Sequence, residues 1–322
     1  MELFNEILTF LSSVAMLGLS SQLVIKNAAK LAKTTGLGEV VIGFLLLSVS
    51  TSTPEISVAI FSTLTKNVGI TVGDLLGANV TNICLIIALG LIVSGKVLRI
   101  KKEEIANLSL LLFFASLIPL TLLFLGELGF LVGIFLLAFF FGFCFFSVKR
   151  KISFKEEKEK KNNIVKPLIW LLFGIFFLVY SAMFVVNSAS VISEITGISQ
   201  SVIGASVVAL STTLPELSVC LTAFKEGHPH LSLGDTIGSC VTNITLILGL
   251  VLILSEFEVS IAAFSTMVLF ASFSALLLWY FMRKRVLTRK EGFILIFIYL
   301  IYMLSIYGVI AWERMFYLPS FK

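Results

Sequence analysis

The residues with the clearest chemical potential are two glutamates that each follow a proline within an apolar stretch. Residues 51–55 read TSTPE, and residues 212–216, at an offset of 161, read TTLPE. A carboxylate buried in apolar surroundings costs several kcal/mol unless it is paired, protonated or bound to a cation. Glu55 and Glu216 have no Lys or Arg in the adjoining apolar sequence. The pattern therefore predicts a cation site, and two ionised glutamates would balance one divalent cation.

Hydroxyl groups recur on the same helical face as each glutamate. Their spacing of i, i+3, i+4 and i+7 gives the sets Ser48, Thr51, Ser52 and Glu55 in the first half, and Ala209, Thr212, Thr213 and Glu216 in the second. Hydroxyl, carboxylate and carbonyl oxygens suit Ca²⁺, Na⁺ or H⁺ better than metals that prefer thiolate or imidazole.

The two prolines are predicted to kink or break their helices. Neither Pro54 nor Pro215 can donate the usual backbone hydrogen bond. In a membrane, the carbonyls freed in this way are tolerated where they line a cavity or coordinate an ion. A simple proline kink with back-bonded hydroxyls would be the better explanation if the glutamates and the repetition were absent.

A second element repeats at the same offset. Residues 73–82, GDLLGANVTN, match residues 234–243, GDTIGSCVTN. The glycines Gly77 and Gly238 permit close helix approach. We expect that approach to bring the side chains of Asn82 and Asn243 towards the helices that carry the glutamates.

Asp74 and Asp235 open this second element near the expected helix starts. Helix capping and lining of a vestibule are equally good interpretations of these two carboxylates. Direct binding of a cation is the weaker alternative.

Composition places the chain among polytopic membrane proteins. Hydrophobic residues make up 58%, charged residues 13%, and the mean hydropathy is +1.05. A helix needs about 20 apolar residues to cross the hydrocarbon layer. We therefore predict an all-α protein with ten transmembrane helices, which span 3–25, 38–64, 70–95, 104–125, 128–148, 167–193, 200–224, 231–255, 259–282 and 292–312.

Basic residues predict the orientation of these helices. With the ten spans drawn, 21 of the 24 Lys and Arg residues fall on one side, which is then cytoplasmic, with both termini outside. The net charge of +5 therefore needs no nucleic-acid partner. Residues 149–166 form a polar cytoplasmic linker between a first repeat at 1–148 and a second at 167–322.

Each predicted half contains an odd number of helices, so the two copies must enter the membrane in opposite directions. This predicts an inverted repeat with its site near the midplane, as in many alternating-access transporters. No nucleotide-binding loop, nucleophile-base pair or metal-hydrolase spacing indicates an enzyme. The cysteines have no CxxC spacing and suggest packing.

The repeated elements resemble the alpha-1 and alpha-2 repeats of the cation/calcium antiporter superfamily, in particular its sodium/calcium exchanger family. The resemblance covers residues 41–93 and 202–254. It implies that helices 2, 3, 7 and 8 form the ion-binding core, and that helices 1 and 6 are a long gating pair.

The resemblance also implies roles for individual residues. Glu55 and Glu216 would hold Ca²⁺ with the help of Thr51 and Thr212. Na⁺ sites that overlap or flank the Ca²⁺ position would use Ser52, Thr213, Ser239 and the carbonyl oxygens of Ser48 and Ala209.

Two positions depart from the family pattern. Ala78 stands where microbial relatives commonly have a hydroxyl, which puts the sodium affinity or stoichiometry in question. Asn243 stands where some relatives, and the potassium-dependent branch, have Asp, which argues against K⁺ dependence.

We therefore expect a secondary antiporter that exchanges Na⁺ for Ca²⁺ across the cell membrane. We expect it to work as a monomer in lipid, without a cofactor. An H⁺/Ca²⁺ exchanger that uses the same glutamates is the main alternative. A cation channel is less favoured, and a protease acting within the bilayer is a distant third possibility.

Overall fold

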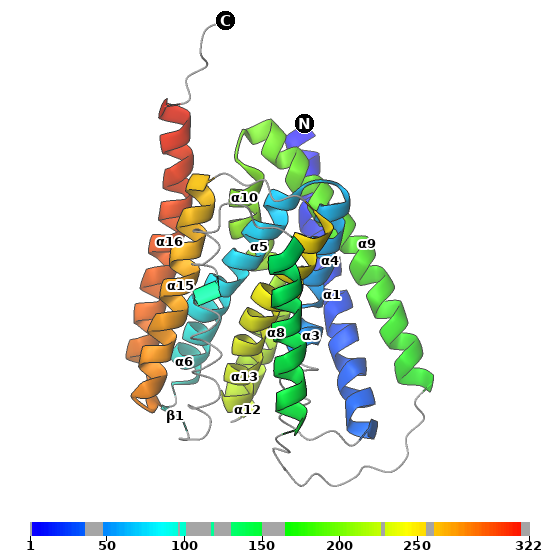
Figure 1. Ribbon diagram of the computed structural model, residues 1–322, viewed down its shortest axis with the longest axis vertical. Helices are drawn as coiled ribbons and strands as arrows, with labels where there is room; N and C mark the ends of the chain where they lie inside the picture. Colours follow the sequence, from blue (N-terminus) through cyan, green and yellow to red (C-terminus); the bar gives the residue numbers. More distant parts are fainter. Residues whose placement is uncertain are drawn as a thin grey trace, which may run out of the picture.

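The computed structural model describes residues 2–35, 48–95, 97–100, 117–118, 130–149, 165–226, 229–255 and 261–316, and these are almost entirely helical. The first half contributes α1 (Glu2–Thr35), α3 (Ser48–Thr51), α4 (Thr53–Leu64), α5 (Val68–Val80), the π-helical turn η2 (Thr81–Ile87), α6 (Ala88–Ser94), β1 (Leu98–Arg99) and α8 (Phe130–Lys149). Figure 1 shows these elements packed side by side with those of the second half.

The second half repeats much of this order. It contributes α9 (Val165–Thr196), α10 (Gln200–Ile203), η3 (Gly204–Val208), α11 (Ala209–Thr212), α12 (Leu214–Glu226), α13 (Pro229–Thr242), η4 (Asn243–Ile247), α14 (Leu248–Leu254), α15 (Ile261–Arg283), β2 (Val286–Leu287) and α16 (Arg289–Phe316). The strands β1 and β2 pair antiparallel, with Leu98 opposite Leu287, and so tie the two halves together.

Six described helices are long and apolar enough to cross a membrane. They are Glu2–Val24, Val68–Ser94, Val165–Thr196, Ser232–Leu254, Phe264–Arg283 and Arg289–Gly308. A bent pair, Gln200–Thr212 with Leu214–Lys225, adds a seventh span if it is counted as one. The predicted helix at 104–125 lies outside the described residues apart from positions 117 and 118. Residues 38–47, the first part of the helix predicted at 38–64, also lie outside them. The count of ten stays a prediction.

The predicted breaks at the two prolines are confirmed. One residue separates α3 from α4 and another separates α11 from α12. These residues, Ser52 (φ −76°, ψ 9°) and Thr213 (φ −82°, ψ 4°), both lie in the sparsely populated bridge region. The second pair bends by 43°. Both helices are thus interrupted just before the proline and glutamate.

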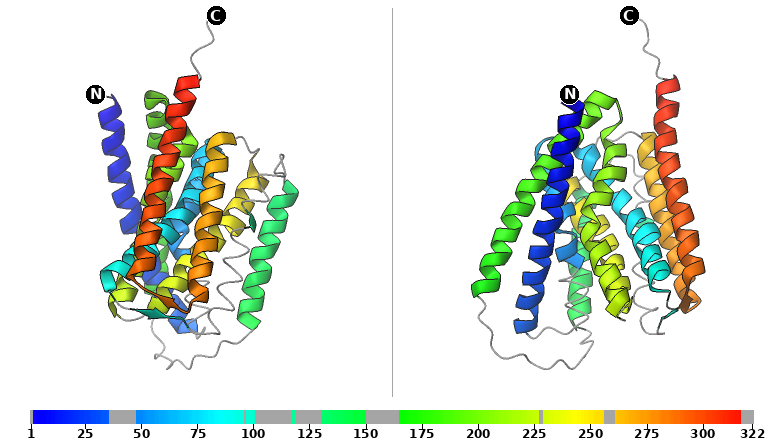
Figure 2. Two further views of the ribbon diagram at one scale, coloured as in Figure 1. Left: turned by 90° about the vertical axis from the view of Figure 1, so that its left-hand side faces the viewer. Right: turned by 180° about the vertical axis from the view of Figure 1, so that it is seen from behind.

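The two longest described helices, α1 with 34 residues and α9 with 32, pack against each other along their length. Figure 2 shows them side by side at one edge of the molecule, tilted relative to the helices behind them. Their chain directions are opposite, because α1 starts at the end where α9 finishes (Figure 1). The first helix runs past its predicted end at residue 25.

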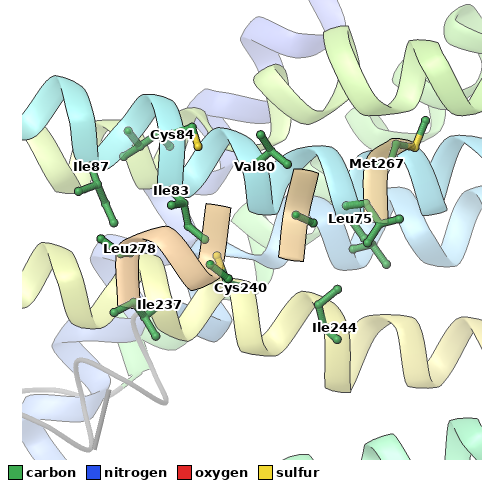
Figure 3. Close-up of a cluster of buried hydrophobic side chains, with 14 of the residues drawn as sticks. Leu75, Val80, Ile83, Cys84, Ile87, Ile237, Cys240, Ile244, Met267 and Leu278 are labelled. Atoms are coloured by element: carbon green, nitrogen blue, oxygen red, sulfur yellow. The ribbon is translucent and has the colours of Figure 1, made fainter. Parts of the chain in front are cut away.

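The centre of the molecule is an apolar core between the two halves. Figure 3 shows side chains of α5 and η2, such as Val80 and Ile83, beside Ile237 and Ile244 of α13 and η4. Leu278 of α15 packs into the same cluster. The second repeated elements of both halves are therefore in contact with one another.

Charged connections gather at one end of the molecule. The end of α8 (Lys149), the start of α9 (Val165) and the β1–β2 ribbon lie opposite the ends of α1 and α16 that are nearest the termini (Figure 1). The α4–α5 connection, which carries Lys66, lies at the terminal end. The basic connections named here thus lie at one end of the molecule, while the assignment of that end to the cytoplasm stays a prediction.

Glycines let backbones of the two halves touch. A Cβ atom on Gly77 would lie 2.4 Å from the carbonyl oxygen of Ala205, and one on Gly204 would lie 2.3 Å from that of Ile70. Gly73 is similarly closed by Ser201. The close approach expected at Gly77 is confirmed, and it joins α5 to α10 and η3.

We predict that Gly77→Ala destabilises the protein by about 1–3 kcal/mol or more, because the added methyl group meets backbone rather than a movable side chain. The midpoint of thermal loss of monodispersity in detergent would report the change. Gly308→Ala in α16 is the matched control, because a Cβ atom there meets nothing within 4 Å. Equal midpoints for the two variants would contradict the role assigned to Gly77.

Candidate functional site

The two glutamates begin the helices that follow the breaks. Glu55 is in the first turn of α4 and Glu216 in the first turn of α12, and both side chains are 0% exposed. Asp74 and Asp235 are also buried, at 0% and 1%. The carboxylate of Glu216 is within electrostatic range of the other three. Segments 48–65, 67–95, 200–224 and 231–255 contain no Lys or Arg.

Threonine hydroxyls connect each half to an aspartate of the other. The hydroxyl of Thr212 donates to Asp74 Oδ1 over 2.8 Å, and that of Thr51 donates to Asp235 Oδ1 over 3.2 Å. Thr51 and Thr212 are equivalent at the 161-residue offset, and so are Asp74 and Asp235. The two contacts are therefore one interaction made reciprocally between the halves.

Ser239 contacts oxygen atoms from both halves of the chain. Its hydroxyl donates to Glu216 Oε1 over 3.0 Å and lies 3.2 Å from Thr51 Oγ1, while Ser52 donates to it over 3.2 Å. The equivalent residue of the first half is Ala78, which has no hydroxyl. The surroundings of Glu55 and Glu216 therefore differ at this point.

The carbonyl oxygens of the predicted set already accept hydrogen bonds. Ser48 O accepts from the backbone N–H of Ser52 at 3.0 Å and from Thr51 Oγ1 at 3.1 Å. Ala209 O has three donors within reach: Thr213 N at 3.2 Å, Thr213 Oγ1 at 2.8 Å and Thr212 Oγ1 at 3.2 Å. A cation at either carbonyl would have to displace a hydrogen bond.

The asparagines lie where α5 and α13 pass into their π-helical turns. Asn243 donates to Asn79 Oδ1 over 3.1 Å, and Asn79 donates to the carbonyl of Cys240 over 3.2 Å. The side-chain amide of Asn82 is fully buried and has no hydrogen-bond partner among the described residues. Single π-helical turns inside α-helices are often found at functional sites.

Several buried oxygens of the site lack a hydrogen-bond partner among the described residues. They are both carboxylate oxygens of Glu55, Asp74 Oδ2, Glu216 Oε2, Asp235 Oδ2, Asn82 Oδ1 and Asn243 Oδ1. Unsatisfied oxygens of this kind fit a positively charged occupant. Within the described part of the chain, no three acidic, histidine or cysteine side chains converge as a metal cluster. An ion here would need hydroxyl, amide or carbonyl oxygens as well.

The structure corrects the capping interpretation of the aspartates. Asp74 lies in the second turn of α5, whose N-cap residue is Asn67, and Asp235 lies equally far into α13. The expected helix starts were too close to these residues. The sequence analysis also missed Asn79. Its equivalent in the second half is Cys240, so the residue does not recur as a matching polar pair at the 161-residue offset.

Comparison with known proteins shows the family of the chain. The sodium/calcium exchanger protein family matches residues 5–149 and 166–308. Among curated proteins, the inner membrane protein YrbG of Escherichia coli (strain K12) is 25% identical over 278 residues, which cover 81% of this chain and 84% of that protein. The sodium/calcium exchanger MaX1 of Methanosarcina acetivorans is 25% identical over 349 residues, covering 94% and 98%.

Solved structures give the same result. A structure of the sodium-calcium exchanger NCX_Mj, soaked with 10 mM Na⁺ and zero Ca²⁺, superposes with a TM-score of 0.67 at 26% identity. The match covers 94% of this chain and 99% of that one. Because the family match spans nearly the whole of both halves, the chain is an integral membrane protein of the sodium/calcium exchanger family.

Proposed function

We propose that this protein is a secondary antiporter that exchanges Na⁺ for Ca²⁺ by alternating access. The observation that carries the proposal is Glu55, a fully buried carboxylate with no hydrogen bond to either oxygen from a described residue. Glu216, also buried, has one unpartnered oxygen. Oxygen ligands without nitrogen or sulfur suit Ca²⁺ and Na⁺.

Within this proposal the ligand set is the one that the sequence predicts. Ca²⁺ would lie between Glu55 and Glu216 with oxygens of Thr51 and Thr212. Na⁺ would use Ser52, Thr213, Ser239 and the carbonyl oxygens of Ser48 and Ala209. The amides of Asn82 and Asn243 complete the proposed ion site. Competition of Na⁺ and Ca²⁺ for shared oxygens would couple the two fluxes.

We further propose that the two halves, 1–148 and 167–322, form an inverted repeat of ten helices. Two observations support this. The equivalent helices α1 and α9 run in opposite directions (Figure 1). The reciprocal bonds from Thr51 and Thr212 are the pattern expected when equivalent residues are related by a pseudo-two-fold axis.

The same inverted arrangement gives the transport cycle a physical basis. Bare carboxylates are costly to move through a low-dielectric region, so the protein would change between its open states only when ions neutralise them. The paired α1 and α9 are the proposed moving elements. We place both termini outside the cell membrane and the 149–166 linker in the cytoplasm, and expect a functional monomer.

The specific observation that favours a second candidate, H⁺/Ca²⁺ exchange, is the asymmetry at Ala78. Ser239 gives Glu216 a hydroxyl donor, whereas Glu55 has none from a described residue. A proton on Glu55 could take the place of a sodium ion that lacks one ligand.

Uptake of ⁴⁵Ca²⁺ into proteoliposomes tests the two candidates against each other. Two conditions are compared at the same membrane potential: an outward Na⁺ gradient and an outward H⁺ gradient. We expect the Na⁺ gradient to drive uptake. Uptake driven by the proton gradient alone would replace the sodium proposal with H⁺/Ca²⁺ exchange. Single-channel currents above carrier turnover would overturn both.

We predict that Glu55→Gln and Glu216→Gln each lower Ca²⁺ uptake at least about a hundredfold, because losing one buried charge partner costs about 3–5 kcal/mol. Retained monodispersity would show that the variants fold. Glu194→Gln, at an exposed residue of α9, is the matched control and should transport normally. Full uptake by both site variants would sink the assignment.

We predict that Ala78→Ser strengthens the apparent Na⁺ affinity of uptake by about three- to tenfold, since it supplies the first half with the hydroxyl that Ser239 gives the second. Ser239→Ala should act in the opposite direction. The Na⁺ concentration dependence of ⁴⁵Ca²⁺ flux measures both. If Ala78→Ser leaves this dependence unchanged, the missing hydroxyl is not what distinguishes the two halves.

A further inference from the structure

The two buried aspartates Asp74 and Asp235 have no part in the ligand set above, and they contact it through single hydroxyl groups. Asp74 accepts from Thr212, and Asp235 accepts from Thr51. Each bond joins helices from opposite halves, α5 with α11 and α13 with α3. The aspartates therefore act on the site from outside its proposed first layer of oxygens.

A threonine hydroxyl has one proton and can give it to only one acceptor at a time. For Thr212 the choices are Asp74 Oδ1 at 2.8 Å and the Ala209 carbonyl at 3.2 Å. The shorter bond to a carboxylate is the stronger of the two. Donation to Asp74 fixes the hydroxyl rotor and directs the lone pairs of Thr212 Oγ1 away from Asp74.

If the Thr212 hydroxyl pointed to Ala209 instead, the Ala209 carbonyl oxygen would also be less available to an ion. Without Asp74, Thr212 would bond back to Ala209, which is the usual behaviour of a threonine within a helix. The Ala209 carbonyl would then be held by Thr212 as well as by both donors of Thr213. Donation to Asp74 thus fixes the orientation of Thr212 Oγ1. It also leaves the Ala209 carbonyl, a member of the predicted set, with one hydrogen-bond donor fewer.

Buried polar atoms without hydrogen-bond partners indicate that the oriented hydroxyl of Thr212 serves to bind an ion. Glu55 is 0% exposed with both oxygens unpartnered by described residues, and Asn82 is 0% exposed with an unpartnered amide. The carboxyl groups of Glu55 and Asp74 are close enough to interact electrostatically. A cation held there would find the lone pairs of Thr212 already arranged.

We propose that Asp74 and Asp235 are positioning residues that orient the hydroxyl oxygens of Thr212 and Thr51 towards the transported cation, each from the opposite half of the chain. The inference rests on the proposed function, because it assumes that these threonines hold Ca²⁺. It makes each half-site dependent on an acceptor from the other half. Outer-layer partners of this kind commonly orient the groups that hold a metal.

Equilibrium binding of ⁴⁵Ca²⁺ to the purified full chain in detergent tests the proposal at Asp74. The variants are Asp74→Leu, which keeps the branched shape but removes the acceptor, Asp74→Asn, which keeps an acceptor oxygen, Thr212→Val, and the double variant Asp74→Leu/Thr212→Val. We expect Asp74→Leu to raise the Kd about tenfold and Asp74→Asn to stay within about twofold of wild type.

The double variant separates positioning from a merely structural role. If Asp74 acts through Thr212, Asp74→Leu should weaken binding by less than about twofold once Thr212 is Val. Additive effects of the two changes would overturn the proposal. So would an Asp74→Asn variant that binds as weakly as Asp74→Leu, because the charge and not the acceptor would then matter.

A parallel cycle with Asp235→Leu and Thr51→Val provides the same test if Asp74→Leu does not fold, as judged by monodispersity. A smaller effect is expected there, because Thr51 has Ser239 as a further neighbour at 3.2 Å. Absence of Ca²⁺ binding by the wild-type chain would refute the proposed function itself. Normal wild-type binding with additive variants would refute the positioning role alone.

Discussion

The constraint on which the rest of the structure depends is the burial of four carboxylates in apolar helices without a basic residue beside them. Glu55, Asp74, Glu216 and Asp235 are each at most 1% exposed. In water such groups are solvated, but at membrane depth each needs a proton, a donor or a cation. The hydroxyl groups supply some of these donors, and other carboxylate oxygens have no hydrogen-bond partner among the described residues. Both oxygens of Glu55 are among them.

Helix interruptions and close packing bring these groups together. Ser52 and Thr213 take non-helical backbone conformations just before the proline-containing first turns of α4 and α12, and those turns carry the two buried glutamates. Gly77 and Gly204 let the backbones of α5 and η3 approach to a distance that a side chain would prevent. Such proximity allows a short threonine hydroxyl to reach an aspartate of the opposite half.

The two halves contain equivalent helices, but the hydroxyl groups around their glutamates differ. Ser239 links Thr51, Ser52 and Glu216, whereas Ala78 links nothing in the first half. Thr213 bonds back to Ala209, although its equivalent Ser52 reaches across to Ser239. The duplicated scaffold therefore surrounds its two glutamates with different hydrogen-bond donors.

The sequence by itself determined the membrane class and the family, because the apolar composition and the 161-residue repeat of Pro, Glu, Gly, Asp and Asn can be read without knowing how the chain folds. It also predicted the interruptions at Pro54 and Pro215, since proline lacks the hydrogen-bond donor wherever the chain folds. Only the tertiary structure decided that Asp74 and Asp235 lie inside their helices and accept hydrogen bonds from Thr212 and Thr51. The physical reason is that a hydroxyl finds its acceptor through space, and these partners are 138 and 184 residues apart in the chain.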